Sequence, residues 1–323
     1  MSQQTMTRRT LLAATLGTGA ALALPGPSSS AAAVAARFGA YVPDPFWDWA
    51  GWPAQLNAFT SQVGRAPSIL HWFCAWGGEQ PFPAATARKA AARGALPLIT
   101  WEPWNWSLGA TQANYRLAKI TAGTFDAYVR TFALAAKAYA APVYLRFAPE
   151  MNGDWNPWSE KVNGNHAGDF VRAWNHVRSI FVSIGATNVR WVWTPIVNYN
   201  GSTPLAGLFP GDGAVDLVGV DGYNWGTLRS TSTWQTYSQI FSASLSQIRS
   251  LSGKPIWLAE VGCTERGGDK AAWVTDMFAR VAVDSRIAAL VWFNANKETD
   301  WRVSSSAASL RAFRTSLATL NYR

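Results

Sequence analysis

The sequence predicts a single (β/α)8 barrel, because eight short apolar runs alternate with segments of helical periodicity. Each run is rich in β-branched or aromatic residues and apolar at successive positions, as in a parallel strand covered on both faces. Roughly 290 residues for eight such units lies within the usual range of this barrel. The runs are Phe38–Val42, Ile69–Phe73, Leu96–Trp101, Val143–Phe147, Val189–Trp193, Leu217–Val220, Ile256–Ala259 and Ala289–Phe293.

Apolar positions at helical spacing separate most of these runs. Gly94, Gly185 and Gly253 follow three of the segments as C-terminal caps. After the fifth run, residues 198–213 are polar and rich in Gly and Pro, so we expect only a short helical piece near Leu205–Phe209. The expected helices are Trp52–Val63, Ala84–Arg93, Phe125–Tyr139, Asp169–Ile184, Trp234–Leu251, Ala271–Val283 and Ser305–Leu317.

A doubly wound open sheet is the alternative fold, but it would carry a glycine-rich phosphate turn after an early strand, and the sequence has none. The composition is that of a globular protein, with 49% hydrophobic and 15% charged residues. The net charge is +9, yet no run of Lys or Arg occurs, which favours a solvated surface over a nucleic-acid partner.

The first 36 residues resemble an export signal. Arg8 and Arg9 precede a short apolar stretch that ends near Leu24, and the stretch is too short to span a membrane. Residues 37–323 then form the catalytic domain, which we expect to be secreted, monomeric and free of the membrane after signal removal.

No cofactor or metal is expected. Cys74 and Cys263 form no CxxC motif, and the three histidines form no zinc motif. Cys74 and Cys263 could form a disulfide after export or remain buried thiols.

Tryptophan is unusually frequent, with 19 in the chain. Several stand in polar, loop-like contexts, where flat rings suit the faces of sugar rings; base stacking would call for interleaved Lys or Arg. Trp191, Trp193 and Trp257 lie within strands, so we expect them to pack in the barrel wall. The loop-like set includes Trp76, Trp104, Trp106, Trp155, Trp158 and Trp225.

Two glutamates directly follow apolar runs, Glu150 after the fourth and Glu260 after the seventh. Active sites of these barrels lie at the carboxyl ends of the strands, so the two carboxyls should face each other. Cleavage of a glycosidic bond needs such a pair, one to protonate the leaving oxygen and one to meet the anomeric carbon. Glu102, with Trp101 before it, and His71 could also line the cleft, although ion pairing or core packing would explain them equally well.

The segment Arg146–Trp158 contains Glu-Met-Asn-Gly-Asp-Trp-Asn-Pro-Trp from Glu150 onward and resembles the acid/base region of glycoside hydrolase family 26. Val218–Trp225 and Lys254–Gly262 resemble the regions of its sixth strand and its nucleophile. The resemblance implies a retaining mechanism with Glu150 as acid/base and Glu260 as nucleophile.

The same resemblance implies further roles. Tyr223 would orient the nucleophile, Trp155 and Trp292 would form a sugar platform, and Arg146 and Asn152 would position the acid and the substrate. Pro149 stands where the family often has His. The family mostly cleaves β-1,4-mannan, which is our first expectation for the polysaccharide partner.

Other substrates and functions remain open. A mixed-linkage β-1,3-1,4-glucan or a β-1,3-xylan is the alternative substrate. The residues of the motifs Glu150–Trp158 and Tyr223–Trp225 resemble the glucanase branch of the family more closely. A non-catalytic carbohydrate-binding barrel is the alternative of another class. The pI of about 9.8 also admits an acidic envelope polymer.

Overall fold

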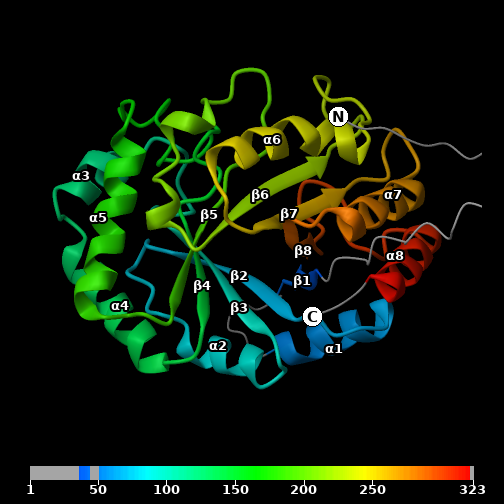
Figure 1. Cartoon of the computed structure of the whole chain (residues 1–323), viewed down its shortest axis with the longest axis horizontal. Coiled ribbons are helices and arrows are strands. Elements are labelled where there is room, and N and C mark those ends of the chain that lie inside the picture. Colours follow the sequence, from blue (N-terminus) through cyan, green and yellow to red (C-terminus); the bar gives the residue numbers. More distant parts are fainter. Residues whose placement is uncertain (1–35, 44–50, 321–323) are drawn as a thin grey trace, which may run out of the picture. The chain divides into compact units, whose positions relative to one another are not determined.

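The computed structural model describes residues 36–43 and 51–320, and these residues form a closed barrel of eight parallel strands in chain order (Figure 1). The predicted barrel is confirmed. The strands are β1 Arg37–Tyr41, β2 Ile69–Ala75, β3 Leu96–Glu102, β4 Val143–Phe147, β5 Val189–Trp193, β6 Leu217–Asn224, β7 Ile256–Cys263 and β8 Ile287–Phe293. The predicted export segment lies outside the described residues up to residue 35.

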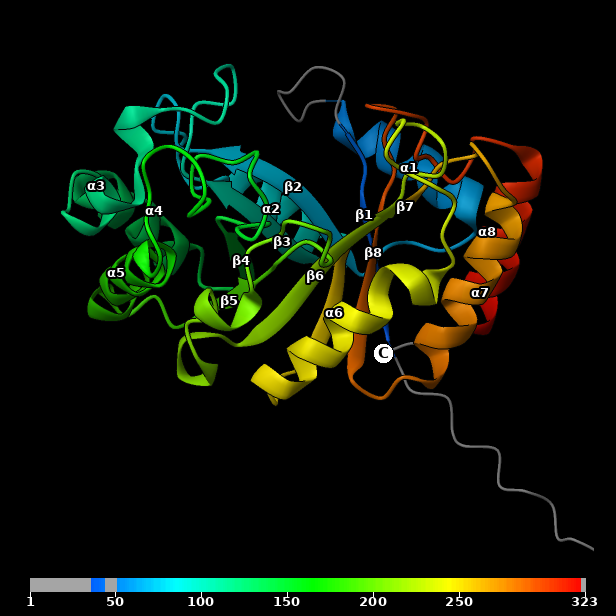
Figure 2. The same cartoon turned by 90° about the horizontal axis from the view of Figure 1, so that it is seen from above.

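Helices follow the strands and cover the outside of the barrel. They are α1 Trp52–Val63, α2 Ala84–Ala91, α3 Leu117–Thr121, α4 Asp126–Tyr139, α5 Asp169–Ile184, α6 Tyr237–Leu251, α7 Lys270–Val283 and α8 Ala307–Thr319. Figure 2 shows α7 and α8 side by side on one flank, with α3, α4 and α5 on the opposite flank. None of the helices described is long and apolar enough to cross a membrane.

The predicted elements agree closely with the observed ones, and the differences have physical reasons. After β5 the chain makes only two short 3-10 turns, as expected from its Gly and Pro content. The short helix α3 was not predicted. Strands β6 and β7 extend beyond the apolar runs, because polar residues of these strands continue the hydrogen-bonded ladder at the barrel mouth.

Alternation along the strands divides the side chains between two environments. The interior of the barrel is filled by the buried set Ile69, Leu98, Val192, Leu217, Trp257, Ala289 and Val291. The other face packs on the helices, as when Phe38 of β1 meets Phe313 of α8. Trp191 and Trp193 are buried against Trp174 and Phe209, and Trp257 packs against Tyr144, so their expected packing role is confirmed.

Strand β7 contains a β-bulge near its carboxyl end, at the mouth of the barrel. Gly219 pairs with Trp257 and Val220 with Leu258, but Asp221 pairs with Glu260, so β7 carries one extra residue at Ala259. Strict alternation from Trp257 would turn Glu260 outward to the helices. The bulge resets the alternation and points Glu260 into the barrel, a common use of bulges beside active sites.

The two cysteines are free and buried, which answers the question that the sequence left open. Burial raises the pKa of both Cys74 and Cys263 to about 12, so both thiols stay protonated and unreactive.

Candidate active site

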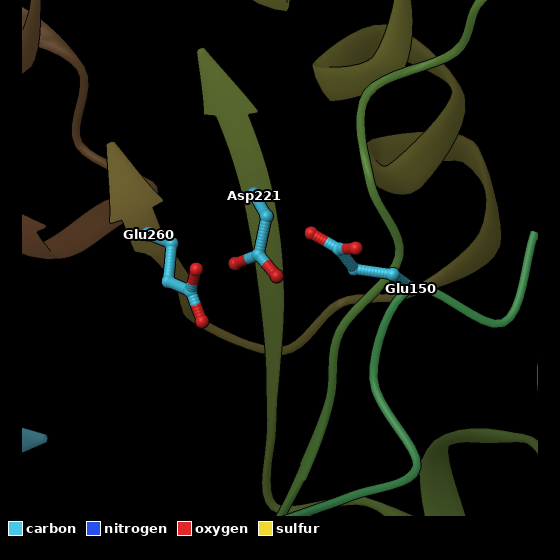
Figure 3. A group of neighbouring side chains, drawn as sticks. All are labelled: Glu150, Asp221 and Glu260. Atoms are coloured by element: carbon cyan, nitrogen blue, oxygen red, sulfur yellow. The ribbon is translucent and has the colours of Figure 1, made fainter. Parts of the chain in front are cut away.

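Three carboxyl groups meet at the carboxyl ends of the strands (Figure 3). Glu150 follows β4, Asp221 lies in β6 and Glu260 in β7, and one oxygen from each lies within 4.8 Å of the others. The structure therefore brings together the two glutamates predicted to face each other. Asp221 was missed as a site residue, although a charged residue that directly follows the apolar run Leu217–Val220 was the available signal.

Glu260 is held by two donors and is 5% exposed. Arg146 Nη2 donates to its Oε1 at 2.6 Å, and the Tyr223 hydroxyl donates to its Oε2 at 2.5 Å. The Arg146 Nη1 donates to Asp221 Oδ1 at 3.1 Å. Asp221 and Glu260 raise the pKa of Arg146 although its burial opposes them, so the guanidinium is a fixed cation between two strands.

Glu150 lies on a strained backbone. Ala148 and Glu150 have φ of 46° and 55°, a left-handed region that residues with a Cβ seldom adopt. The Glu150 amide donates to Thr194 O at 2.7 Å, which anchors the turn on β5. This turn ends the strand and carries the Glu150 side chain toward Asp221 and Glu260 (Figure 3).

The Glu150 carboxyl is surrounded differently from that of Glu260. The Trp155 indole donates to its Oε2 at 2.8 Å. Burial, followed by the nearby Glu260, raises the pKa of Glu150 to about 7, against the opposing effects of Arg146, Trp155 and Lys297. A carboxyl with that pKa can hold a proton near neutral pH and deliver it as a general acid.

Asp221 is fully buried between the two glutamates. Burial raises its pKa well above the usual range, Glu260 and Glu150 act in the same direction, and Arg146 opposes them. Three carboxylates this close together repel one another, and one guanidinium compensates only part of that repulsion. The three carboxyl groups together therefore retain a proton.

The same three carboxyls form a group whose spacing could suit a metal ion. Arg146 and Tyr223 already donate to both oxygens of Glu260 and to one of Asp221. Since a guanidinium within this set would repel a second cation, the donors fit a charge-balanced acid pair better than a metal site.

Two further predicted residues lie beside the carboxyls. His71 is fully buried, bonds Thr100 Oγ1 at 2.7 Å and lies 3.9 Å from Glu260 Oε1. Burial and Arg146 lower its pKa, so the ring is neutral, and because it is fully buried it does not reach the surface of the mouth. Glu102 is partly exposed at the end of β3, accepts from Trp104 Nε1 at 3.0 Å and has its pKa raised to about 7, chiefly by burial.

Aromatic rings form one wall of the mouth. Tyr41, Phe293 and Trp301 are buried, and Phe73, Tyr223 and Trp225 pack against them. Trp301 was not predicted as a site residue, because its place in the loop after β8 gives no strand-end signal. The Arg229 guanidinium lies 3.7 Å from the centre of the Trp225 ring, so one face of this predicted platform is covered by a cation.

Four tryptophans predicted to bind substrate are fully enclosed, and these predictions are wrong. Trp101 and Trp292 occupy outward positions of their strands, where they pack on Phe132 of α4 and Phe313 of α8. Successive side chains of a strand point to opposite faces, and a run that is apolar at every position does not show which of them point into the barrel. The four, each at most 1% exposed, are Trp76, Trp101, Trp158 and Trp292.

The other two enclosed tryptophans support loops. Trp76 packs against Phe147 and Tyr128, between the barrel and α4. Trp158 donates its indole N–H to Pro149 O at 2.6 Å and thereby holds the turn that carries Glu150.

Arg146 and Asn152 form hydrogen bonds with other groups of the protein. Both are at most 1% exposed, and their predicted substrate contacts are wrong because neither side chain reaches the surface of the mouth. Arg146 binds Glu260 and Asp221, whereas Asn152 pairs with the backbone of Ile196 through Nδ2 and Oδ1, both at 2.9 Å. Of the two rings predicted to form the sugar platform, Trp155 is well exposed, at 41%, unlike Trp292, and its ring lies 5.7 Å from that of Tyr199.

Known proteins share the family and the fold. Residues 104–254 match the domain described as Glycosyl hydrolase family 26. The chain is 38% identical over 266 residues to Endoglucanase H of Acetivibrio thermocellus, which covers 80% of this chain and 28% of that protein. It is 28% identical over 187 residues to Beta-1,3-xylanase TXYA of Vibrio sp, covering 55% of this chain and 39% of the xylanase. The chain thus spans well under two thirds of these curated relatives.

Solved structures share the fold. The catalytic domain of a Bacillus sp. JAMB-750 GH26 endo-β-1,4-mannanase superposes with a TM-score of 0.68 at 19% identity, covering 90% of this chain and 87% of that one. A β-mannanase from a symbiotic protist of the termite Reticulitermes speratus superposes with a TM-score of 0.62 at 17% identity, covering 88% of each. A (β/α)8 barrel with paired carboxyls at its mouth is typical of glycoside hydrolases. The chain belongs to glycoside hydrolase family 26.

Proposed function

We propose that this chain is an endo-acting, retaining β-glycan hydrolase in which Glu150 is the acid/base and Glu260 the nucleophile. The observation that carries the assignment is the contrast between their surroundings. Arg146 and Tyr223 stabilise and aim the Glu260 carboxylate, while burial raises the pKa of Glu150 to about 7. One oxygen of Glu150 lies within 4.8 Å of one oxygen of Glu260, a closeness that favours the short carboxyl spacing of retaining enzymes, about 5–5.5 Å, over the wider spacing of inverting ones.

The reaction would proceed in two displacements. Glu150 donates its proton to the glycosidic oxygen while a Glu260 oxygen bonds the anomeric carbon, and the aglycone leaves as an alcohol. Glu150, now ionised, then takes a proton from water, whose oxygen attacks the same carbon and releases Glu260. Arg146 and Tyr223 hold the Glu260 carboxylate ready for attack before each cycle.

We propose a β-glucan as the substrate. Support comes from the 38% identity to a protein named Endoglucanase H over 80% of this chain, and from Pro149, which replaces the His common in the family. β-1,4-Mannan, our first expectation from the sequence, is the second candidate, and β-1,3-xylan the third. The mannanase structures share the fold at identities of 15–19% and favour no substrate.

One experiment tests the substrate and the mechanism together. Purified protein is incubated with mixed-linkage β-glucan, β-1,4-mannan and β-1,3-xylan, and the products are sized. Release of oligosaccharides from the glucan first, with retained anomeric configuration by NMR, supports the proposal. Faster cleavage of mannan would replace the substrate, inversion would replace the mechanism, and binding without turnover would favour a carbohydrate-binding barrel.

Export and oligomeric state are also proposals. We propose that Arg8 and Arg9 direct twin-arginine export and that the mature chain is a secreted monomer. Replacing both arginines with Lys should retain the protein inside the cell, and light scattering should give the mass of one chain. Normal export of the double variant, or the mass of a dimer, would reject the respective proposal.

A further inference from the structure

Lys270 is a buried cation outside the carboxyl cluster. It is the first residue of α7 and is 1% exposed. A buried ammonium is costly, and the N-terminal end of a helix disfavours a positive charge. Its surroundings must therefore supply the compensation.

The compensation comes from the loop between β8 and α8. Lys270 Nζ donates to Arg302 O at 2.9 Å and to Ser305 Oγ at 2.8 Å, with longer contacts of 3.4 Å to the carbonyls of Asp300 and Trp301. Ser305 Oγ in turn donates to Glu265 Oε1 at 2.6 Å, in the loop after β7. One ammonium thus ties together the loops that follow two neighbouring strands.

The charges around Lys270 favour retention of its proton at neutral pH. Burial lowers the pKa of Lys270 to about 8, and Arg302 adds to this, while the carboxylates of Glu265 and Asp300 oppose it. The ammonium form, with three N–H donors, therefore prevails near pH 7.

The segment that Lys270 holds includes Trp301. The Trp301 ring is enclosed 5.0 Å from Tyr223 and 4.9 Å from Trp225. An added Cβ on Gly262 would lie 2.8 Å from Tyr223 and 3.1 Å from Trp301, so the rings leave no room for displacement on that side. Tyr223 is the residue that donates to Glu260 Oε2.

We propose that Lys270 is a positioning residue for the nucleophile, acting through the loop of residues 294–306. Its ammonium fixes the carbonyls of residues 300–302, these fix the Trp301 ring, and that ring holds Tyr223 on Glu260. Lys270 touches neither the substrate nor the reacting atoms. The inference rests on the proposed function only for its activity readout.

The test compares Lys270→Met with Lys119→Met, an exposed lysine on α3. Lys270→Met leaves the carbonyls without their donor, so amide hydrogen exchange in residues 294–306 should accelerate about tenfold, while exchange in β2 and β3 stays unchanged. On the cleaved glycan, kcat should fall about tenfold with KM nearly constant, because orientation of the nucleophile is lost and substrate contacts are kept. Lys119→Met should change neither quantity.

Chemical rescue separates positioning from general destabilisation. Lys270→Ala should regain part of its kcat when propylammonium is added, because the small cation can occupy the vacated space, whereas sodium at equal ionic strength should not help. Ser305→Ala, which removes one acceptor of Lys270, should accelerate hydrogen exchange in residues 294–306 to a smaller extent. This variant replaces the Lys270 variants in the test if both of them fail to fold. Unchanged hydrogen exchange in residues 294–306 would overturn the proposal. Faster exchange in this loop together with a wild-type kcat would overturn it as well. Absence of turnover in every protein, wild type included, would reject the proposed function alone.

Discussion

The segment after β4 and the bulged end of β7 each present one glutamate to the same space, but they hold it in opposite ways. Glu150 stands on a left-handed turn, partly exposed, and accepts a hydrogen bond from the Trp155 indole. Glu260 lies within a strand, 5% exposed, with a guanidinium and a phenol on its two oxygens. Identical side chains thus acquire different surroundings: burial favours a held proton on Glu150, whereas two donors fix the orientation of the Glu260 carboxyl.

The largest effect should follow removal of the proposed nucleophile. Glu260→Ala deletes the proposed nucleophile and removes the shorter of the two carboxyl hydrogen bonds of Arg146, so kcat should fall by roughly 10⁴-fold or more. Steady-state assays on the cleaved glycan measure this, with Asp276→Asn on the outside of α7 as control. A residual rate within about tenfold of wild type would remove the contrast between the two glutamates.

Removal of the proton donor should cost less and depend on the leaving group. Glu150→Gln should lower kcat on polysaccharide by about 10²–10⁴-fold, but much less on an aryl glycoside with an acidic phenol, which needs little protonation. Added azide should restore turnover of the aryl substrate in Glu150→Ala and give the β-glycosyl azide. Equal losses on both substrates would indicate that Glu150 does not act as the acid.

Loss of one donor to Glu260 should give an intermediate effect. Tyr223→Phe keeps the ring against Trp301 and removes the hydroxyl, so kcat should fall by about 10–100-fold. This factor corresponds to the usual free-energy contribution of a hydrogen bond to a charged group. Tyr139→Phe, whose hydroxyl meets Ala87 O far from the mouth, is the matched control. If both variants behaved alike, the Tyr223 hydroxyl would have no special role.

The smallest effect concerns stability and pH. The pKa of Glu150, about 7, lies above the ordinary carboxyl value of 4.5, so the folded protein binds this proton more tightly than the unfolded chain. The associated stability is present below pH 4.5 and is lost as the pH rises to 7. Glu150→Gln should therefore melt about 2–4 °C above wild type at pH 8 and show little gain at pH 4. A larger gain at pH 4 would contradict the raised pKa.

Most of the barrel could be predicted because its signals are local. Helices α1 and α5 and strands β4 and β5 have the predicted bounds, since apolar periodicity and capping glycines mark them within the sequence. Glu150 and Glu260 could be found because both follow strand runs at one end of the barrel. Trp101 and Trp292 were misplaced, because a strand buried on both faces gives no pattern that separates inside from outside.

The sequence by itself determined the barrel, its order of strands and helices, and the pair of glutamates at its mouth, because hydrophobic periodicity and strand ends depend on near neighbours in the chain. Only the tertiary structure decided that a bulge at Ala259 turns Glu260 inward, that Asp221 joins the pair, and that Arg146 binds Glu260. These features depend on register between strands and on contacts over 75 to 114 residues of sequence, which local pattern does not encode.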